Sequence, residues 1–270
     1  FALWGWWNVS ETTPWISLHV LEALIEAEQL NYKVNIKKDL ITQSLIWMFA
    51  NTKDFDTQIR ILKSVILMRA KADYEGFYKE LEKHDLTDIS DQLQMLEISQ
   101  LIGKPIDIQM IKKHQETTLF GNIYISKPQK NMKIFTNEIQ NPLLAYRILQ
   151  RDSVLRKSEA ETLRKMRNYF LEKRNTGKWL NTYESVQIIE TILPDLLGNE
   201  THVKAPEVHI KGILDQKITE FPFEIELNPD ASLEISKTGT SPVYMSISQN
   251  YWDSNPIPFS ADFEIKTHFS

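Results

Sequence analysis

The residues of this chain whose types could do chemistry are six isolated histidines and several acids at predicted helix starts. The sequence has no cysteine, so it offers no thiolate nucleophile, disulfide or cysteine metal site. No histidines are spaced as metal ligands, and we therefore expect no metal centre and no cofactor. We expect His19 to pack within a helix, and His84 and His114 to lie near helix C-terminal ends.

Acids recur near the starts of helices that we expect on the inside of the fold, at Glu11, Asp54, Asp56, Asp88 and Glu184. Toroidal glycosidases place two carboxylates across a cleft, so a carbohydrate-active enzyme is one alternative for this chain. Capping explains most of these acids equally well, because a side-chain oxygen at a helix start accepts a backbone N–H. We expect no catalytic residue among them.

Aromatic residues gather near both ends of the helical region and could share one rim of the fold. As possible contacts to an adjoining domain we single out Trp6, Trp7, Trp15, Trp179 and Tyr183. Large aromatic side chains also serve as packing between helices, and this is the simpler reading of the same residues.

The element that must position these residues is a repeating pair of helices. Its clearest copy lies at 177–193, where Asn181 and Glu184 have capping-box spacing. The residues Val186, Ile189, Ile192 and Leu193 recur at intervals of three and four, which predicts a buried stripe, and Pro194 and Gly198 are expected to close the helix. Similar starts recur about every 35 to 50 residues, as in helix-pair repeats.

The same periodicity predicts helices over the first three quarters of the chain. The expected helical runs are 15–30, 36–51, 59–70, 77–81, 89–102, 105–114, 142–150 and 158–173. Residues 119–135 interrupt them and favour a short β-like segment or an ordered loop. The more apolar helix of each pair would line the inside, which gives an α/α toroid; an open helical-repeat solenoid that serves as a binding scaffold is the alternative.

From about residue 203 the pattern changes to alternation with period two, broken by Pro, Gly and Asn. The strands that this alternation predicts lie in the stretches 202–214, 221–228, 232–237, 243–252 and 259–269. We therefore predict a mainly α protein with the toroid at 1–200 and a small antiparallel β module at 201–270. The formal charge of −5 has no long run of one sign, which argues against nucleic acid as a partner. No apolar run is long enough to span a bilayer, so membrane attachment would need an anchor outside this fragment.

Two stretches resemble a known family. TPWISLHVLEALIEA is similar to the "W-[IL]-T-x-x-V-x-x-A-L" helix of the thioester domain in the alpha-2-macroglobulin and complement superfamily. GKWLNTYESVQIIETIL resembles the late "W-x-[NS]-T-x-[ED]" helix of the same toroid. The stretches occur in the expected order, and a β segment after the toroid also fits, because in this superfamily the chain then completes a neighbouring β-sandwich.

The resemblance implies a broad-spectrum protease inhibitor rather than an enzyme, with proteases and neighbouring macroglobulin-like β domains as partners. The C-G-E-Q thioester motif is absent, and we expect the chain to be a fragment that begins downstream of it. Complement members carry a His in a long loop here, whereas this chain has only Asn51-Thr52-Lys53-Asp54. That departure suits the bacterial branch, and with it a periplasmic or cell-surface location.

Overall fold

The computed structural model divides the chain into two compact units, residues 1–194 and 195–270. The structure describes residues 3–5, 12–126, 138–174, 179–198, 205–212, 215–228, 232–239, 243, 245 and 247. Within the described residues the protein is mainly helical, with two small antiparallel sheets.

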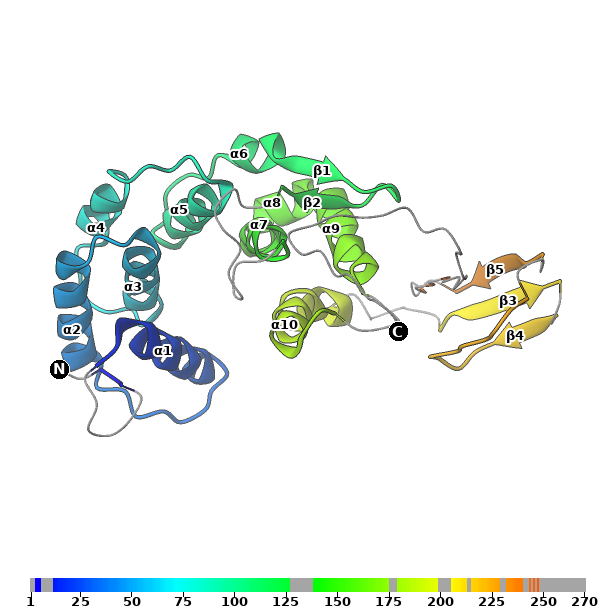
Figure 1. The fold of residues 1–270 in the computed structure, drawn as a ribbon, viewed down its shortest axis with the longest axis horizontal. Helices are drawn as coiled ribbons and strands as arrows, with labels where there is room; N and C mark the ends of the chain where they lie inside the picture. Colours follow the sequence, from blue (N-terminus) through cyan, green and yellow to red (C-terminus); the bar gives the residue numbers. More distant parts are fainter. Residues whose placement is uncertain are drawn as a thin grey trace, which may run out of the picture. The chain divides into compact units, whose positions relative to one another are not determined.

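The first unit is built from helices in the order that the periodicity predicts (Figure 1). The helices are α1 (Pro14–Gln29), α2 (Lys38–Asn51), α3 (Phe55–Leu67), α4 (Tyr74–Leu81), α5 (Ile89–Leu101), α6 (Ile108–Lys113), α7 (Gln140–Arg151), α8 (Ser153–Ser158), α9 (Ala160–Glu172) and α10 (Thr182–Gly198). The predicted run 158–173 is thus mainly α9, preceded by the short α8. The connection between α2 and α3 is as short as the sequence indicates.

Alternate helices of this unit form a row. Helix α1 contacts α3, α3 contacts α5, and α5 contacts α7, while α2 and α4 each pack against α3. Figure 1 shows α2 and α4 outside this row, so that the row follows the inner side of an arc. Short connections between paired helices produce this alternation, because they favour antiparallel neighbours.

Helix starts confirm several of the caps that the sequence predicts. Asp54 accepts a hydrogen bond from the N–H of Thr57, and Asp88 accepts one from the N–H of Ser90. Thr13 precedes the proline that opens α1, but its side chain makes no capping bond. The proline lacks an N–H and already has a helical φ, so α1 begins without that side-chain bond.

The apolar core of the helical row joins the buried faces of α1, α2, α3 and α5. Its largest contributors are fully enclosed aliphatic side chains, among them Leu18, Leu21, Leu45, Ile61, Leu62 and Ile98. Phe49 and Phe77 add an aromatic pair, with ring centroids 4.6 Å apart, between α2 and α4. Burial of each such aliphatic side chain contributes about 1.5–3 kcal/mol to the stability of the fold. This core therefore holds in place the row of helices that carries the polar contacts described below.

Helix α10 differs from its prediction in two respects. Ile192 is buried as expected, but Val186, Ile189 and Leu193 are 44%, 43% and 41% exposed, and the side that packs inward carries Ile188 instead. In addition, the helix passes through Pro194 and ends at Gly198, so of the two residues expected to close it only Gly198 marks its end. The predicted stripe was wrong because intervals of three and four describe two overlapping faces of one helix, and tertiary packing selects between them.

A short hairpin follows α6, and only its second strand lies inside the segment 119–135 for which the sequence predicts a β-like interruption. Strands β1 (Gln115–Thr117) and β2 (Ile123–Ile125) pair antiparallel, with Glu116 opposite Tyr124. Strand β2 packs against α7 and α9, and the Tyr124 ring stacks on the Tyr169 ring at a centroid distance of 5.1 Å. The lysine-rich part of the prediction, 131–135, lies outside the described residues.

The second unit contains a three-stranded antiparallel sheet with the order β4-β3-β5. Its strands are β3 (Glu207–Lys211), β4 (Gln216–Ile218) and β5 (Glu234–Thr238), and Val208, Ile210 and Ile218 form a small core. The predicted strand at 221–228 is not one, since this stretch pairs with no described strand. Of the later predicted strands, 243–252 is described only at three positions and 259–269 not at all.

Candidate functional site

Among the described residues, a line of polar contacts crosses from one helix of the inner row to the next. We call it the polar ladder and define it by Glu22 of α1, Arg60 and Lys63 of α3, Glu97 of α5, Arg147 and Arg151 of α7, and Gln187 and Thr191 of α10. Each seam between neighbouring helices of the row is bridged by at least one of these contacts, and α7 is bridged to α10 through Arg147.

The α1–α3 seam is closed by a two-pronged ion pair. Arg60 donates from its Nε to Glu22 Oε1 at 2.9 Å and from a terminal nitrogen to Glu22 Oε2 at 2.8 Å. The same terminal nitrogen lies 3.1 Å from His19 Nδ1, which also lies 2.9 Å from the Trp15 carbonyl oxygen. Because Nδ1 accepts from arginine only when unprotonated and donates to a carbonyl only when protonated, one tautomer satisfies one contact at a time.

The α3–α5 and α5–α7 seams share one buried acid. Glu97 is only 4% exposed and accepts from Lys63 Nζ at 2.6 Å and from an Arg151 terminal nitrogen at 3.0 Å. Burial by itself would raise the pKa of this carboxyl, but the two cations outweigh it and hold the pKa of Glu97 below its usual range. Glu97 is therefore a fixed negative charge between two helices that each contribute one positive charge.

The α7–α10 seam is bridged without a carboxylate. Arg147 donates to Thr191 Oγ1 at 2.9 Å and to Gln187 Oε1 at 3.0 Å. Burial lowers the pKa of Arg147, although Glu97 and Glu190 act in the opposite direction. The hydrogen-bond acceptors that hold this guanidinium are thus neutral and orient the side chain, while Glu97 and Glu190 act on its charge without forming an ion pair with it.

The exposed face of α10 brings a second group of residues toward α1. Burial raises the pKa of Tyr183. The charge of Glu22 also raises this pKa, whereas the charges of Arg147 and Arg60 lower it. Burial raises the pKa of Glu190 as well, and the nearby carboxylate of Glu26 adds to the increase. The guanidinium of Arg147 acts on the pKa of Glu190 in the opposite direction.

The five aromatic residues singled out from the sequence do not form one cluster among the described residues. Trp6 and Trp7 lie outside the described residues. The Trp15 ring packs on the His19 ring with centroids 4.3 Å apart, beside the Glu22–Arg60 pair, and Tyr183 senses the charges of that pair. Trp179 instead donates its indole N–H to the Phe170 carbonyl at 2.7 Å, a packing contact at the end of α9. The structure thus places Trp15 on the His19 ring beside the Glu22–Arg60 pair and gives Trp179 other neighbours.

Most of the described acids that we weighed as catalytic candidates lie at helix starts, where they take part in capping. Asp54 and Asp88 are caps, as described above. The N–H of Glu184 donates to Asn181 Oδ1 at 2.8 Å, so this half of the predicted capping box is confirmed. Glu11 lies outside the described residues. Two of the histidines have local roles: His84 Nε2 lies 2.7 Å from Gln58 Oε1, and His114 is the C-terminal cap of α6.

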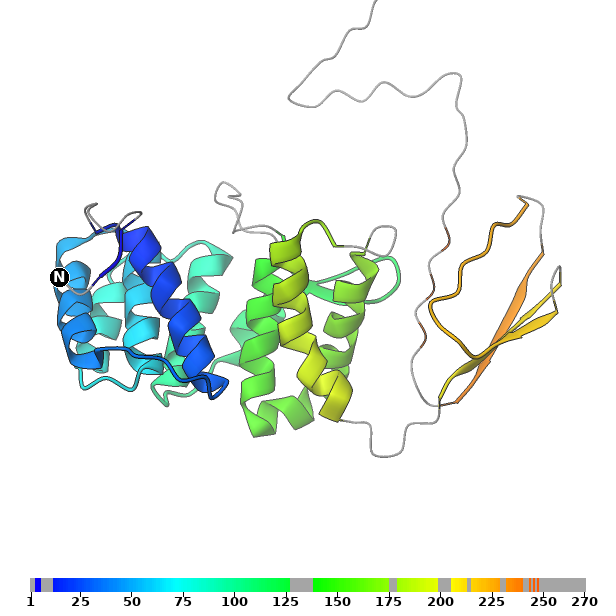
Figure 2. The same cartoon turned by 90° about the horizontal axis from the view of Figure 1, so that it is seen from below.

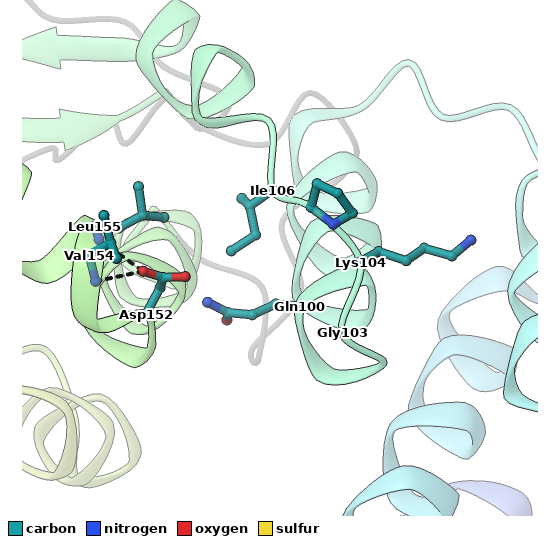
Figure 3. A pocket seen from close by; sticks show the side chains of 8 residues that line it. Gln100, Gly103, Lys104, Ile106, Asp152, Val154 and Leu155 are labelled. Atoms are coloured by element: carbon teal, nitrogen blue, oxygen red, sulfur yellow. Dashed lines mark hydrogen bonds between the residues drawn. The ribbon is translucent and has the colours of Figure 1, made fainter.

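Two shallow hollows lie away from the polar ladder's α1–α3 seam. One, of about 340 Å³, lies between the end of α5 and the start of α8. Figure 3 shows that Asp152, in the lining of this hollow, accepts hydrogen bonds from the N–H groups of Val154 and Leu155. The other, of about 450 Å³, lies among α2, α3 and α4 and includes Asp73, which caps α4, and Glu80, which pairs with Lys83. The acids of both hollows already have hydrogen-bond partners.

Sequence reasoning missed most of the polar ladder, although a signal was present. Glu22 and Glu26, Arg60 and Lys63, and Arg147 and Arg151 are like-charged pairs at helical spacing, and the sign alternates from one inner helix to the next. Like charges at that spacing destabilise an isolated helix, so their presence indicates partners on neighbouring helices.

The remaining observations concern ligands, membranes and relatives. In the part of the chain that the structure describes, no three histidine or acidic side chains converge as metal ligands. No helix in that part is long and apolar enough to cross a bilayer. A scan against protein-family models finds no match to this chain, and a search of curated proteins finds no significant match.

Proposed function

We propose that this region is part of a bacterial-type alpha-2-macroglobulin, in which it forms the helical toroid of a protease trap at the cell envelope. The observation that carries the proposal is the alternation of helices in the first unit. The helices α1, α3, α5 and α7 contact one another in series, with α2 and α4 outside them, and a separate antiparallel sheet unit follows. An α/α toroid continued by strands of a neighbouring domain would have this order of elements.

The position of the two family-like stretches also supports the proposal. TPWISLHVLEALIEA covers the start and middle of α1, and the late stretch covers the Asn181 cap and the first turns of α10. Each therefore falls on an inner helix and includes its N-terminal end. In the toroid that we propose, Trp15 and Tyr183 lie on the rim that contacts the neighbouring β domains.

The enzyme and scaffold alternatives receive less support. A toroidal glycosidase needs two available carboxylates in a cleft. In the described hollows Asp152 is occupied in capping and Glu80 in an ion pair, and the like-charged Glu26 and Glu190 lie beside an exposed apolar helix face. A solenoid scaffold would present an apolar or aromatic concave groove, whereas the inner row here is closed by ion pairs.

The test of the proposal uses the full parent protein that contains this region. The parent protein is mixed with each of a panel of proteases, and the remaining activity of the protease is measured on a large protein substrate and on a small chromogenic peptide. A trap predicts that cleavage of the large substrate falls while cleavage of the small one persists. A protease adduct on a denaturing gel that methylamine prevents would indicate a thioester trap, and its absence a steric one. Equal activity on both substrates would refute the proposal.

A pair of variants within this region adds a control. Trp15→Ala removes a predicted rim contact, whereas Trp47→Ala removes an exposed tryptophan of α2, a helix outside the row. Under the proposal, Trp15→Ala weakens trapping of the protease and Trp47→Ala leaves it unchanged. If the two variants behave alike, Trp15 has no role at a domain contact.

A further inference from the structure

Strand β5 forms an open edge of the three-stranded sheet in the second unit. It lies beside β3 at one side of this sheet (Figures 1 and 2), and no described strand pairs with its other side. All five residues of β5 are exposed. An edge strand presents a row of backbone N–H and C=O groups that can pair with another strand. The outer side of β5 is therefore a place where a further strand can add.

The apolar face of the sheet is left uncovered at this edge. Val208 and Ile210 of β3 are buried on that face, and Ile235 of β5 lies directly opposite Ile210. Side chains that oppose each other in an antiparallel pair share a face of the sheet. Ile235 is nevertheless 38% exposed, whereas Ile218 of β4, at the other edge, is only 5% exposed. The apolar position that lacks cover is thus at the β5 edge and not at the β4 edge.

Residues 259–269, which lie outside the described residues, have the sequence pattern that this edge requires. Apolar and polar residues alternate along this segment with the period of a β-strand. Its large apolar residues all fall on one side of that alternation: Phe259, Phe263, Ile265 and Phe269. The predicted strand at 221–228 does not fill the edge, because it is described and pairs with no described strand.

The chain is long enough to bring this segment to β5. Val243 packs against the small core of the sheet, so the chain is still beside the sheet at that residue. Residues 244–258 then lead to the segment. An extended chain advances about 3.3 Å per residue, so this connection can reach about 50 Å, roughly three times the length of a five-residue strand. The connection therefore permits either direction of pairing.

The charges favour one direction and one register. If the segment runs antiparallel to β5 with Ile265 opposite Ile235, then Lys266 lies opposite Glu234 on the polar face of the sheet. Opposite charges in directly opposed positions stabilise a pair of strands. If the segment runs parallel with the same two isoleucines opposed, Glu264 takes the position beside Glu234, and like charges there are destabilising.

We propose that residues 259–269 bind along the open edge of β5 as an antiparallel fourth strand, with Ile265 opposite Ile235 and Lys266 opposite Glu234. The apolar side of the segment covers Ile235 and extends the core face of the sheet. Its backbone pairs with the N–H and C=O groups of β5 that point away from β3. The pairing lies within the second unit and does not depend on the proposed protease trap.

Disulfide cross-linking in the 270-residue chain tests this pairing, because the chain has no cysteine of its own. Ser236→Cys combined with Glu264→Cys places two thiols directly opposite each other, at a Cα separation of about 4.5–5.5 Å that suits a disulfide. The matched control combines Ser232→Cys with Glu264→Cys, which is out of register by about 13 Å along the strand. Under oxidation with copper phenanthroline, the first pair should form an intramolecular disulfide and the control should not. Mass spectrometry of the linked peptides identifies the product.

Hydrogen exchange gives an independent measurement on the same chain. Ile265→Ser removes the apolar contact that covers Ile235, so the amide hydrogens of β5 should exchange about tenfold faster, the effect expected from the loss of one buried isoleucine. The matched control is Ile257→Ser, which changes the same residue type outside the segment. It should leave the exchange rates of β5 unchanged.

Three results would overturn the proposal. Equal cross-linking of both cysteine pairs, or none of the first pair, would show that the segment does not lie along β5 in this register. Cross-linking only between two chains, seen as a covalent dimer on a nonreducing gel, would mean that the segment of a second copy occupies the edge. Exchange in β5 that is the same in Ile265→Ser as in the control would mean that the segment does not cover this strand.

Discussion

Replacing Glu97 with glutamine is the most direct test of the polar ladder. The substitution keeps the size of the side chain but removes the negative charge that Lys63 and Arg151 share. A hydrogen bond to a charged group contributes about 1.5–3 kcal/mol and a neutral one about 1 kcal/mol. Both cations are 37% exposed, so solvent screens part of the difference. We expect a loss of about 1–2 kcal/mol at pH 7, which corresponds to a fall in Tm of about 3–6 °C.

The pH dependence of that loss has a definite sign. An unfolded glutamate has a pKa of about 4.3, and in the folded protein the two cations hold the pKa of Glu97 below its usual range in spite of burial. The unfolded chain therefore takes up a proton at a higher pH than the folded one. The stability that Glu97 contributes is complete well above pH 4.3 and is lost as the pH falls through the folded pKa. The difference between the wild type and Glu97→Gln should shrink toward pH 3.

The assay is urea unfolding followed by far-UV circular dichroism, which reports on the helical unit, at pH 7 and at pH 3. The matched control is Glu161→Gln, since Glu161 pairs with Arg164 at 2.5 Å but is largely exposed. The control should leave the unfolding midpoint unchanged at both pH values. The reasoning fails if Glu97→Gln behaves like the control at pH 7, or if its effect is as large at pH 3 as at pH 7.

Three further predictions concern packing, capping and backbone geometry. Ile188→Ala should lower the free energy of unfolding by about 2–4 kcal/mol because Ile188 is fully buried, whereas Ile189→Ala should change it by less than about 0.5 kcal/mol, both by urea unfolding. Asn181→Ala removes the hydrogen bond to the Glu184 N–H and should cost about 1 kcal/mol in the same assay, while Asn181→Asp should retain most of the stability. Gly239→Ala should speed hydrogen exchange in β3 and β5, because Gly239 has a φ of +85° and an added Cβ would lie 2.4 Å from the Ala205 carbonyl oxygen. Gly121 has a similar φ of +78° but open space around it, so Gly121→Ala should lower the free energy of unfolding by only about 1 kcal/mol in urea.

Much of the helical unit could be predicted from the sequence because its signals are local. The caps at Asp54, Asp88 and Asn181 depend on a side chain and a backbone N–H within three residues of each other. The short connection between α2 and α3 is likewise visible in the order of apolar and polar residues. Such features need no knowledge of the neighbouring helices, and for that reason the predicted helices match the observed ones.

The parts that could not be predicted depend on contacts between elements distant in the sequence. Contacts with neighbouring helices decide which face of α10 packs inward, and one of these contacts is the hydrogen bond from Arg147 of α7 to Thr191. Periodicity alone could therefore not predict that Ile188 is buried and Ile189 exposed. The partners of Glu97 lie 34 and 54 residues away in the sequence. In the second unit, alternation predicted a strand at 221–228, but a strand also needs a partner, and this stretch pairs with no described strand.

The sharing of Glu97 between Lys63 and Arg151 constrains how the sequence can change over time. A charge reversal at position 97 would repel two cations at once, so it requires compensating changes at positions 63 and 151. Glu22 and Arg60 form a pair that can exchange its signs in two steps, each of which costs little because both side chains remain partly exposed. Among homologous sequences, positions 22 and 60 should therefore covary as a simple pair, whereas position 97 should stay acidic.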